Sequence, residues 1–287
     1  MTILFVCALI LLFVAPWGPG QHLEFSERTL RRSERLPRDV EKLLQEEKEA
    51  FQYGSIAADI INFKAYGGDY NHCHRWTIID EMREIARTPK QEAFIFGYLA
   101  HLCADTVAHN HFVPYHLCRF ARTKGLGHLY WELSADRFVS ESRWKIIPRL
   151  KTIDDVTELD DLVNRTVPRK ALSMGANKLI FNNVLLVSER DSWRRMMLKL
   201  HPIEKVRLGK GFLAKFQKAA CERITLAMSP GGFERIRSLD PNGKVAQKQA
   251  FALRKKIVTR WAPGRMRQQE STELAKPFLE GMGLPEC

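Results

Sequence analysis

The sequence lacks the features that mark several common protein classes. Its six cysteines include no C-x-x-C pair, which argues against a thiolate zinc site, and the five that lie beyond residue 7 are an odd number for a disulfide framework. No segment alternates apolar and polar residues beside hairpin turns, so a β-sheet is not expected. Internal repeats and low-complexity tracts are absent as well. What remains is a globular protein built from helices.

Long apolar runs are also scarce. Residues 3–14 form one run of export-signal length, which is short for a helix that crosses a bilayer. We expect residues 1–16 to be a signal peptide and the protein to be exported, either secreted or periplasmic. An N-terminal membrane anchor is the alternative, because no Lys or Arg follows Met1 and no A-x-A pattern marks a cleavage site.

Charge and histidine divide the chain into two parts. Residues 1–140 hold 16 Lys and Arg against 17 Asp and Glu, whereas residues 141–287 hold 29 against 16. Such a basic part indicates an anionic partner, either a membrane surface or nucleic acid, or else a solvated face without a partner. Eight of the nine histidines fall at or before residue 128. We therefore expect a metal-binding catalytic core over residues 17–140 and a basic helical part over 141–287 that completes or extends the same domain.

Apolar residues recur at helical spacing along most of the chain, which predicts an all-α fold. The expected helices cover residues 24–36, 39–51, 78–86, 88–113, 128–138, 154–164, 170–188, 203–228 and 244–261. The helix over 88–113 starts with the capping box Thr88-Pro-Lys-Gln91 and should end at Pro114. Most of its faces are apolar, so we place it at the centre of the domain.

Two polar residues interrupt this central helix. His101 and Asp105 are four residues apart, so they project from one helix face and can share a metal ion. Buried without a partner, such groups would cost several kcal/mol. His128 and Glu132 repeat the spacing in a later helix. Nitrogen and oxygen ligands of this kind suit zinc and also admit manganese or iron.

Further donors leave the ligand set open. The sequence offers Asp59 in an apolar segment and a His72-x-His74 pair in a loop. After Asp105, ideal helix geometry places His109 about 60° and His111 about 100° from the midpoint of the His101 and Asp105 directions. Periodicity alone therefore favours His109. Core histidines that are paired with nearby carboxylates, without a metal, are the alternative interpretation.

The order of these residues resembles the zinc-dependent phospholipase C family, whose superfamily includes the S1/P1-type nucleases. Those proteins are all-α and hold three zinc ions with an N-terminal Trp, a His, an Asp, a His, a His-x-x-x-Asp pair, a His six residues later, and a final His-x-x-x-Glu or His-x-x-x-Asp pair. The matching residues here are Trp17, His22, Asp59, His74, His101, Asp105, His111, His128 and Glu132. The resemblance selects His74 over His72, because His74-Arg-Trp76 is similar to the family's His-x-aromatic, and it selects His111 against periodicity.

The resemblance implies three zinc sites. The first would use Asp59, His74, His101 and Asp105, the second His111, His128 and Glu132, and the third Trp17, His22 and Asp105. A zinc-bound hydroxide would attack phosphorus in line, with Asp59 as the candidate that orients or deprotonates the water. The third site requires Trp17 to be the mature N-terminus, and Pro16 before it is unfavourable for signal peptidase.

Two phosphodiester substrates fit this resemblance. A phospholipase C would cleave glycerophospholipids at a membrane surface to diacylglycerol and a phosphorylated headgroup, and Glu132 is typical of that branch. The alternative is a nuclease or 3′-nucleotidase that acts on nucleic acid, a branch that shares the five-residue step from Trp17 to His22. A domain that binds metal or lipid without turnover is the third hypothesis. Whether the protein has a protein partner is not determined by the sequence.

Overall fold

The structure is a computed structural model, and it describes residues 17–68, 72–120, 131, 134–151, 156–188, 208–259 and 264–285. These ranges contain helices and no β-strand, which confirms the all-α prediction. Within the same ranges, no helix has both the length and the apolar character that a membrane span requires. The predicted signal peptide over residues 1–16 lies outside the described residues.

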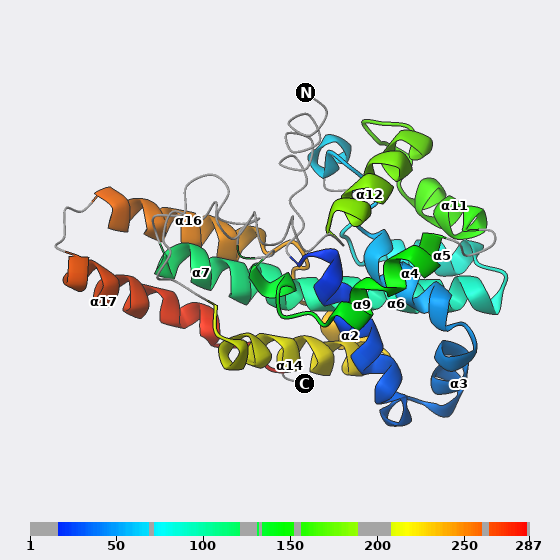
Figure 1. The fold of residues 1–287 in the computed structure, drawn as a ribbon, viewed down its shortest axis with the longest axis horizontal. Helices are drawn as coiled ribbons and strands as arrows, with labels where there is room; N and C mark the ends of the chain where they lie inside the picture. Colours follow the sequence, from blue (N-terminus) through cyan, green and yellow to red (C-terminus); the bar gives the residue numbers. More distant parts are fainter. Residues whose placement is uncertain are drawn as a thin grey trace.

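The helices surround one central rod (Figure 1). In chain order they are α2 (Pro19–Arg31), η1 (Ser33–Arg35), α3 (Arg38–Glu46), α4 (Lys48–Ala57), η2 (Lys64–Gly67), α5 (Thr77–Ile85), α6 (Pro89–Val107), η4 (Ala108–Phe112), α7 (Val113–Arg119), α9 (Glu141–Trp144), α10 (Ile146–Lys151), α11 (Thr157–Thr166), α12 (Met174–Ser188), α14 (Lys210–Ala227), α15 (Gly232–Ile236), α16 (Lys244–Thr259), α17 (Gly264–Ala275) and η5 (Lys276–Leu279). The rod consists of α6, η4 and α7. Helices α4 and α14 pack along α6, and α16 and α17 pack along α7.

The rod begins where the sequence predicts. The Thr88 hydroxyl accepts a hydrogen bond from the backbone N–H of Gln91 at 3.2 Å, and the Gln91 side chain accepts one from the Thr88 N–H at 3.2 Å. This is a complete capping box, and it satisfies two N–H groups that a helix start otherwise leaves unpaired. The prediction that the helix starts at Thr88 is therefore confirmed.

The predicted end of this helix at Pro114 is wrong. The chain passes through a π-helical turn at η4 and continues as α7. The Val113 N–H bonds to the carbonyl of Ala108, and the Asn110 side chain donates to the carbonyl of Thr106 at 2.8 Å. Proline lacks one N–H donor but is tolerated in the first turn of a helix, and Pro114 is the second residue of α7, so the chain stays helical through it.

Two glycines set the distance between α4 and α6. A Cβ atom on Gly54 would lie 2.1 Å from the carbonyl oxygen of Phe94, and one on Gly97 would lie 2.1 Å from that of Phe51. Both positions are closer than any side chain permits, so only glycine allows the two backbones to approach this far. Gly97 lies one turn before His101. The contact therefore brings the end of α4, with Asp59 just beyond it, against the face of α6 that carries His101.

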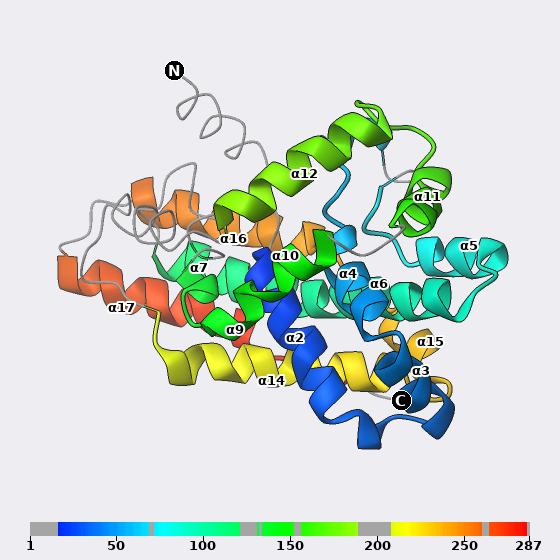
Figure 2. The same cartoon turned by 45° about the vertical axis from the view of Figure 1, so that its right-hand side comes forward.

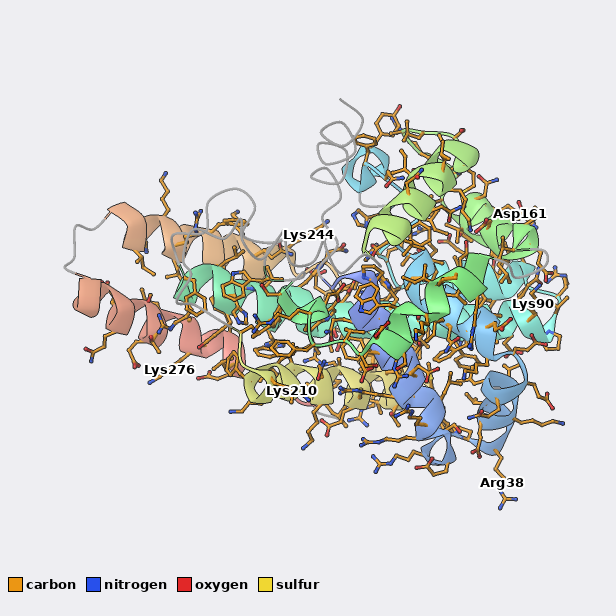
Figure 3. All side chains as sticks on the ribbon, viewed as in Figure 1. Arg38, Lys90, Asp161, Lys210, Lys244 and Lys276 are labelled. Atoms are coloured by element: carbon orange, nitrogen blue, oxygen red, sulfur yellow. The ribbon has the colours of Figure 1, made fainter. Side chains whose placement is uncertain are left out.

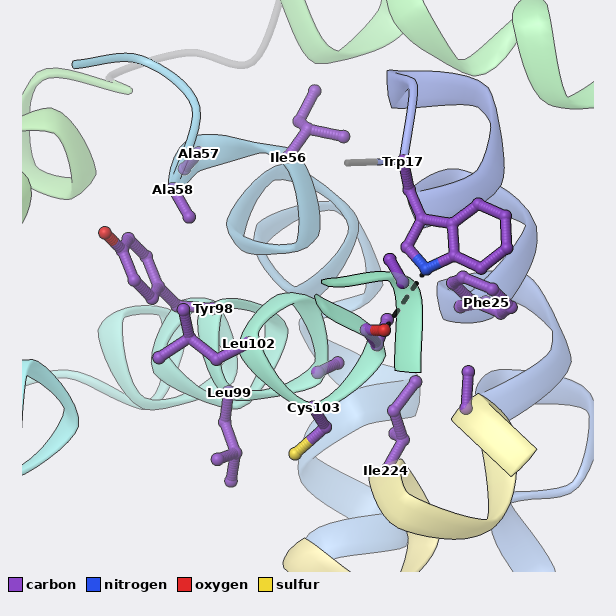
Figure 4. Packing of buried hydrophobic residues seen from close by; sticks show 14 of the residues in the cluster. Trp17, Phe25, Ile56, Ala57, Ala58, Tyr98, Leu99, Leu102, Cys103 and Ile224 are labelled. Carbon is purple, nitrogen blue, oxygen red and sulfur yellow. Dashed lines mark hydrogen bonds between the residues drawn. The ribbon is translucent and has the colours of Figure 1, made fainter. Parts of the chain in front are cut away.

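The basic part of the chain packs directly on this core. Helix α14 contacts both α6 and α2. Its Arg223 is buried, and the guanidinium donates to the Thr106 hydroxyl at 2.8 Å and to the Gly281 carbonyl at 3.0 Å. Trp17 is buried nearby, between Phe25 and the central rod (Figure 4). The division at residue 140 stays a prediction, but the two parts share one apolar core.

Replacing Gly97 should therefore separate the two helices. We expect Gly97→Ala to lower the free energy of unfolding by about 1–3 kcal/mol, because the added methyl group forces the α4 and α6 backbones apart. Thermal and denaturant unfolding followed by circular dichroism would measure this loss.

The matched control is Gly211→Ala in the first turn of α14, where an added Cβ meets nothing within 4 Å. It should leave stability unchanged or raise it by up to about 1 kcal/mol. Equal effects of the two substitutions would contradict the close-contact explanation.

Candidate metal centre

Five side chains from four separate segments converge inside the molecule. They are His22 on α2, Asp59 in the turn after α4, His74 in the loop before α5, and His101 and Asp105 on α6. Three pairs of them lie closest. The Nε2 atoms of His74 and His101 are 3.1 Å apart, and they lie 3.1 and 3.2 Å from Oδ2 of Asp105. The structure thus joins residues that are up to 83 positions apart in the sequence.

The two remaining members complete the cluster. Asp59 Oδ1 lies 3.4 Å from Nε2 of His74 and 3.9 Å from Nε2 of His101. The His22 ring stacks on that of His101, with centroids 3.8 Å apart, and its Nε2 lies 3.5 Å from Oδ1 of Asp105. Asp105 therefore presents one oxygen to His74 and His101 and the other to His22.

The spacing of these atoms fits a tetrahedral metal ion. Zinc holds nitrogen and oxygen ligands at about 2.0–2.2 Å, which places two ligand atoms of a tetrahedron about 3.3–3.6 Å apart. The distances among the donor atoms of Asp59, His74, His101 and Asp105 that are given above fall between 3.1 and 3.9 Å. Where both of these Nε2 atoms carry lone pairs, the lone pairs repel each other at this distance. A shared cation satisfies both lone pairs.

Burial makes a cation at this position more favourable. Asp105 is 0% exposed, and neither of its oxygens accepts a hydrogen bond of normal geometry. Burial alone would raise the pKa of Asp105, but His101, His74 and His22 hold it well below its usual range. Burial and the adjacent His101 lower the pKa of His22 to about 3. The carboxylate is thus ionised and the His22 imidazole neutral, which are the forms that bind zinc.

Outer contacts orient the two central imidazoles. The Nδ1 of His101 lies 2.9 Å from the Ser55 carbonyl, to which it donates in the tautomer that directs Nε2 at the cluster. The loop that holds His74 is anchored by its backbone. The N–H of His74 donates to Nδ1 of His72 at 3.0 Å, and its carbonyl accepts from the Asn242 side chain at 2.8 Å. The structure therefore places His74 in the cluster and His72 behind it, where it supports the loop.

Asp136 positions His22, a role that no pattern in the sequence indicates. Its carboxylate accepts hydrogen bonds from the N–H groups of Gly20 at 3.3 Å and Gln21 at 3.0 Å, at the first turn of α2. A negative charge at a helix N-terminus is favourable, because it faces the positive end of the helix dipole. A Cβ on Gly18 would lie 2.1 Å from Asp136 Oδ2. The absence of a side chain at Gly18 and Gly20 therefore allows the Asp136 carboxylate to cap α2, the helix that carries His22.

The residues of the other two predicted sites have different positions. The Trp17 indole N–H donates to the Ala104 carbonyl at 3.1 Å (Figure 4), so its side chain belongs to the core. His111 lies outside the cluster: its Nδ1 is 3.0 Å from the Phe278 carbonyl, and its Nε2 is 3.3 Å from the Arg223 guanidinium. Burial and Arg223 lower the pKa of His111 to about 4. His128 and Glu132 lie outside the described residues.

The π turn bears on the choice between His109 and His111. Each residue of a π-helix advances through a smaller angle than in an α-helix. Relative to ideal α geometry, η4 therefore rotates His109 toward the face of His101 and Asp105 and rotates His111 away from it. His109 is buried, whereas Nε2 of His111 faces a cation. Local geometry thus favours His109, as periodicity does, and the assignment of His111 as a ligand stays a prediction.

Comparison with known proteins decides the family. The family model for zinc dependent phospholipase C matches residues 21–175, which is more than half of the chain. The chain belongs to this family. No curated protein and no solved structure matches it.

Membership has two consequences. The family consists of zinc-dependent phospholipase C hydrolases, so the chain belongs to a family of zinc enzymes and the cluster is its candidate zinc site. The matched range contains all five residues of the cluster: His22, Asp59, His74, His101 and Asp105. The number of ions is not determined by either observation and remains the prediction of three.

Removing one cluster imidazole should remove zinc. We expect His101→Ala to bind at least about one zinc ion less per chain than the unmodified protein, because Nε2 of His101 lies 3.1–3.9 Å from the donor atoms of His74, Asp105 and Asp59. Metal content after dialysis, measured by mass spectrometry, would show this. Zinc content equal to that of the unmodified protein would contradict the assignment.

The paired variants His109→Gln and His111→Gln would decide between the two neighbouring histidines. If His109 is the ligand, as local geometry favours, His109→Gln loses a zinc ion and His111→Gln retains all its zinc; if His111 is the ligand, as the resemblance implies, the two results are reversed. Circular dichroism of each variant would show whether the fold is retained.

Proposed function

We propose that this protein is an exported phospholipase C that hydrolyses glycerophospholipids to diacylglycerol and a phosphorylated headgroup. The observation that carries this proposal is the convergence of His22, Asp59, His74, His101 and Asp105 in a chain of the zinc-dependent phospholipase C family. Export through residues 1–16 would bring the enzyme to the outer surface of a membrane, where such lipids are available.

The five side chains of the cluster differ in their exposure to solvent. The side chains of His22, His74, His101 and Asp105 are at most 1% exposed, whereas that of Asp59 is 16% exposed. Asp59 is thus the member through which the cluster meets solvent, and substrate must approach from this side. Zinc bound here would lower the pKa of a water molecule toward neutrality and polarise a phosphoryl oxygen.

Asp59 is therefore the residue that we propose to orient the attacking water or to accept its proton. Its Oδ1 is close enough to His74 to share an ion, and a carboxylate has a second oxygen that can face solvent. The buried residues keep their positions through the contacts with Ser55 and Asn242, so the donor set is organised before substrate arrives.

Loss of the Asp59 carboxylate should lower the rate of turnover strongly and the zinc content only weakly. We expect Asp59→Asn to lower kcat on phosphatidylcholine vesicles by about 10²–10⁴-fold, because the amide cannot accept the proton, while more zinc remains than in His101→Ala. The control Asp161→Asn removes an exposed carboxylate that pairs with Arg165 on its own helix, and it should leave kcat unchanged. Diacylglycerol release with zinc present would measure both.

The same proteins assayed on single-stranded DNA separate the alternatives. Zinc-dependent, His101-dependent cleavage of DNA without release of diacylglycerol would replace the phospholipase proposal by the nuclease. Absence of turnover on both substrates would leave a domain that binds metal or lipid.

A further inference from the structure

A cavity lies between α2 and α14, the two helices that cross in the lower half of Figure 2. Its volume is ≈ 730 Å³, within the range of small-molecule sites. Five cationic side chains line it: Arg28, Arg31, Arg32, Arg35 and Lys218. Only two carboxylates face them, those of Glu24 and Glu222. The cavity therefore has an excess of positive charge.

Both carboxylates already have cationic partners. Glu24 pairs with Nε of Arg28 at 2.7 Å and with Nε of Arg143 at 2.9 Å. Glu222 lies 3.7 Å from Nζ of Lys218. The positive charge that these pairs leave unbalanced in the cavity is carried by three arginines at the end of α2 and in η1.

These three arginines are Arg31, Arg32 and Arg35. Within the part of the chain that the structure describes, no carboxylate forms an ion pair with them. Helix α2 ends at Arg31, and η1 (Ser33–Arg35) turns the chain so that all three line the same cavity. Like charges this close repel one another, and an anion between them would relieve the repulsion.

The cavity is separate from the metal centre. Arg31 follows His22 by nine residues on α2, which corresponds to about 13 Å along the helix. None of the metal-cluster residues lines the cavity. An anion held here would therefore not touch the zinc ligands.

We propose that this cavity is a second binding site, which takes an anion with two or more negative charges of the phosphate type. Guanidinium groups suit this ligand because each can donate two parallel hydrogen bonds to phosphate oxygens. A phosphomonoester on a lipid headgroup and a free phosphate compound present the same chemistry. The site does not depend on the reaction proposed for the metal centre.

Two probes distinguish the sources of the phosphate group. Pyrophosphate, titrated by calorimetry, represents a free compound. Flotation with phosphatidylcholine vesicles, with and without phosphatidic acid, represents a headgroup. Binding of pyrophosphate alone would identify a soluble ligand, and binding only to vesicles that contain phosphatidic acid would identify a membrane ligand.

The test variant replaces Arg31, Arg32 and Arg35 together by glutamine. We expect this variant to bind whichever probe the unmodified protein binds at least about tenfold more weakly, because it loses the charge-assisted hydrogen bonds to phosphate. The matched control replaces the exposed Lys210, Lys215 and Lys248 by glutamine. Lys210 lies at the start of α14 (Figure 3), and none of the three lines the cavity. The control removes the same charge and should keep the affinity.

His101→Ala separates this site from the metal centre, since phosphate compounds also bind zinc. Binding that persists in His101→Ala and weakens in the triple arginine variant supports the second site, even if the unmodified protein hydrolyses no lipid. Equal affinity of the arginine and lysine variants, loss of binding in His101→Ala alone, or absence of binding to both probes would overturn the proposal. All three arginines are exposed, so their replacement should leave the circular dichroism spectrum unchanged.

Discussion

The site depends on one buried carboxylate. Asp105 lies on an otherwise apolar stretch of α6, fully excluded from solvent, with three imidazoles within 3.5 Å of its oxygens. An ionised carboxylate in this environment is costly unless a cation compensates it. Among the described residues its ion-pair partners are the three imidazoles, and that of His22 is neutral, because burial and the adjacent His101 lower its pKa to about 3. A metal ion between Asp105 and the imidazoles accounts for the whole arrangement.

The surrounding fold serves to hold those groups against each other. The contact between Gly54 and Gly97 brings α4 to α6 at backbone distance, and the carboxylate of Asp136 fixes the start of α2. Each of these contacts lies within about one and a half turns of a cluster residue. Ser55 and Asn242 then fix the position of an imidazole or of its backbone. Because Asn242 belongs to the basic part of the chain, the metal centre is not a property of residues 17–140 alone.

The distribution of charge is also more local than a count along the sequence indicates. The excess of Lys and Arg after residue 140 suggested that the anionic partner would meet that part of the chain. The basic cavity instead takes most of its cations from α2, η1 and Arg32 between them. In a count along the sequence, the nearby Glu24, Glu27 and Glu34 offset these cations, so the net charge of the segment does not reveal them. Ion pairing removes some of these acids from the balance, and only the folded structure shows which.

By itself, the sequence determined the all-α class, the start of the central helix and the His101 and Asp105 pair, because helical period and capping act over four residues or fewer. The order of the potential ligands was enough to recognise the family. Tertiary structure decided what local pattern cannot reach: that Asp59, His74 and His22 meet that pair, that His74 and not His72 faces the cluster, and that the rod continues past Pro114. These outcomes depend on contacts between segments far apart in the chain. The π turn at η4 belongs with them, because its side-chain and backbone hydrogen bonds alter the helical period on which the positions of His109 and His111 depend.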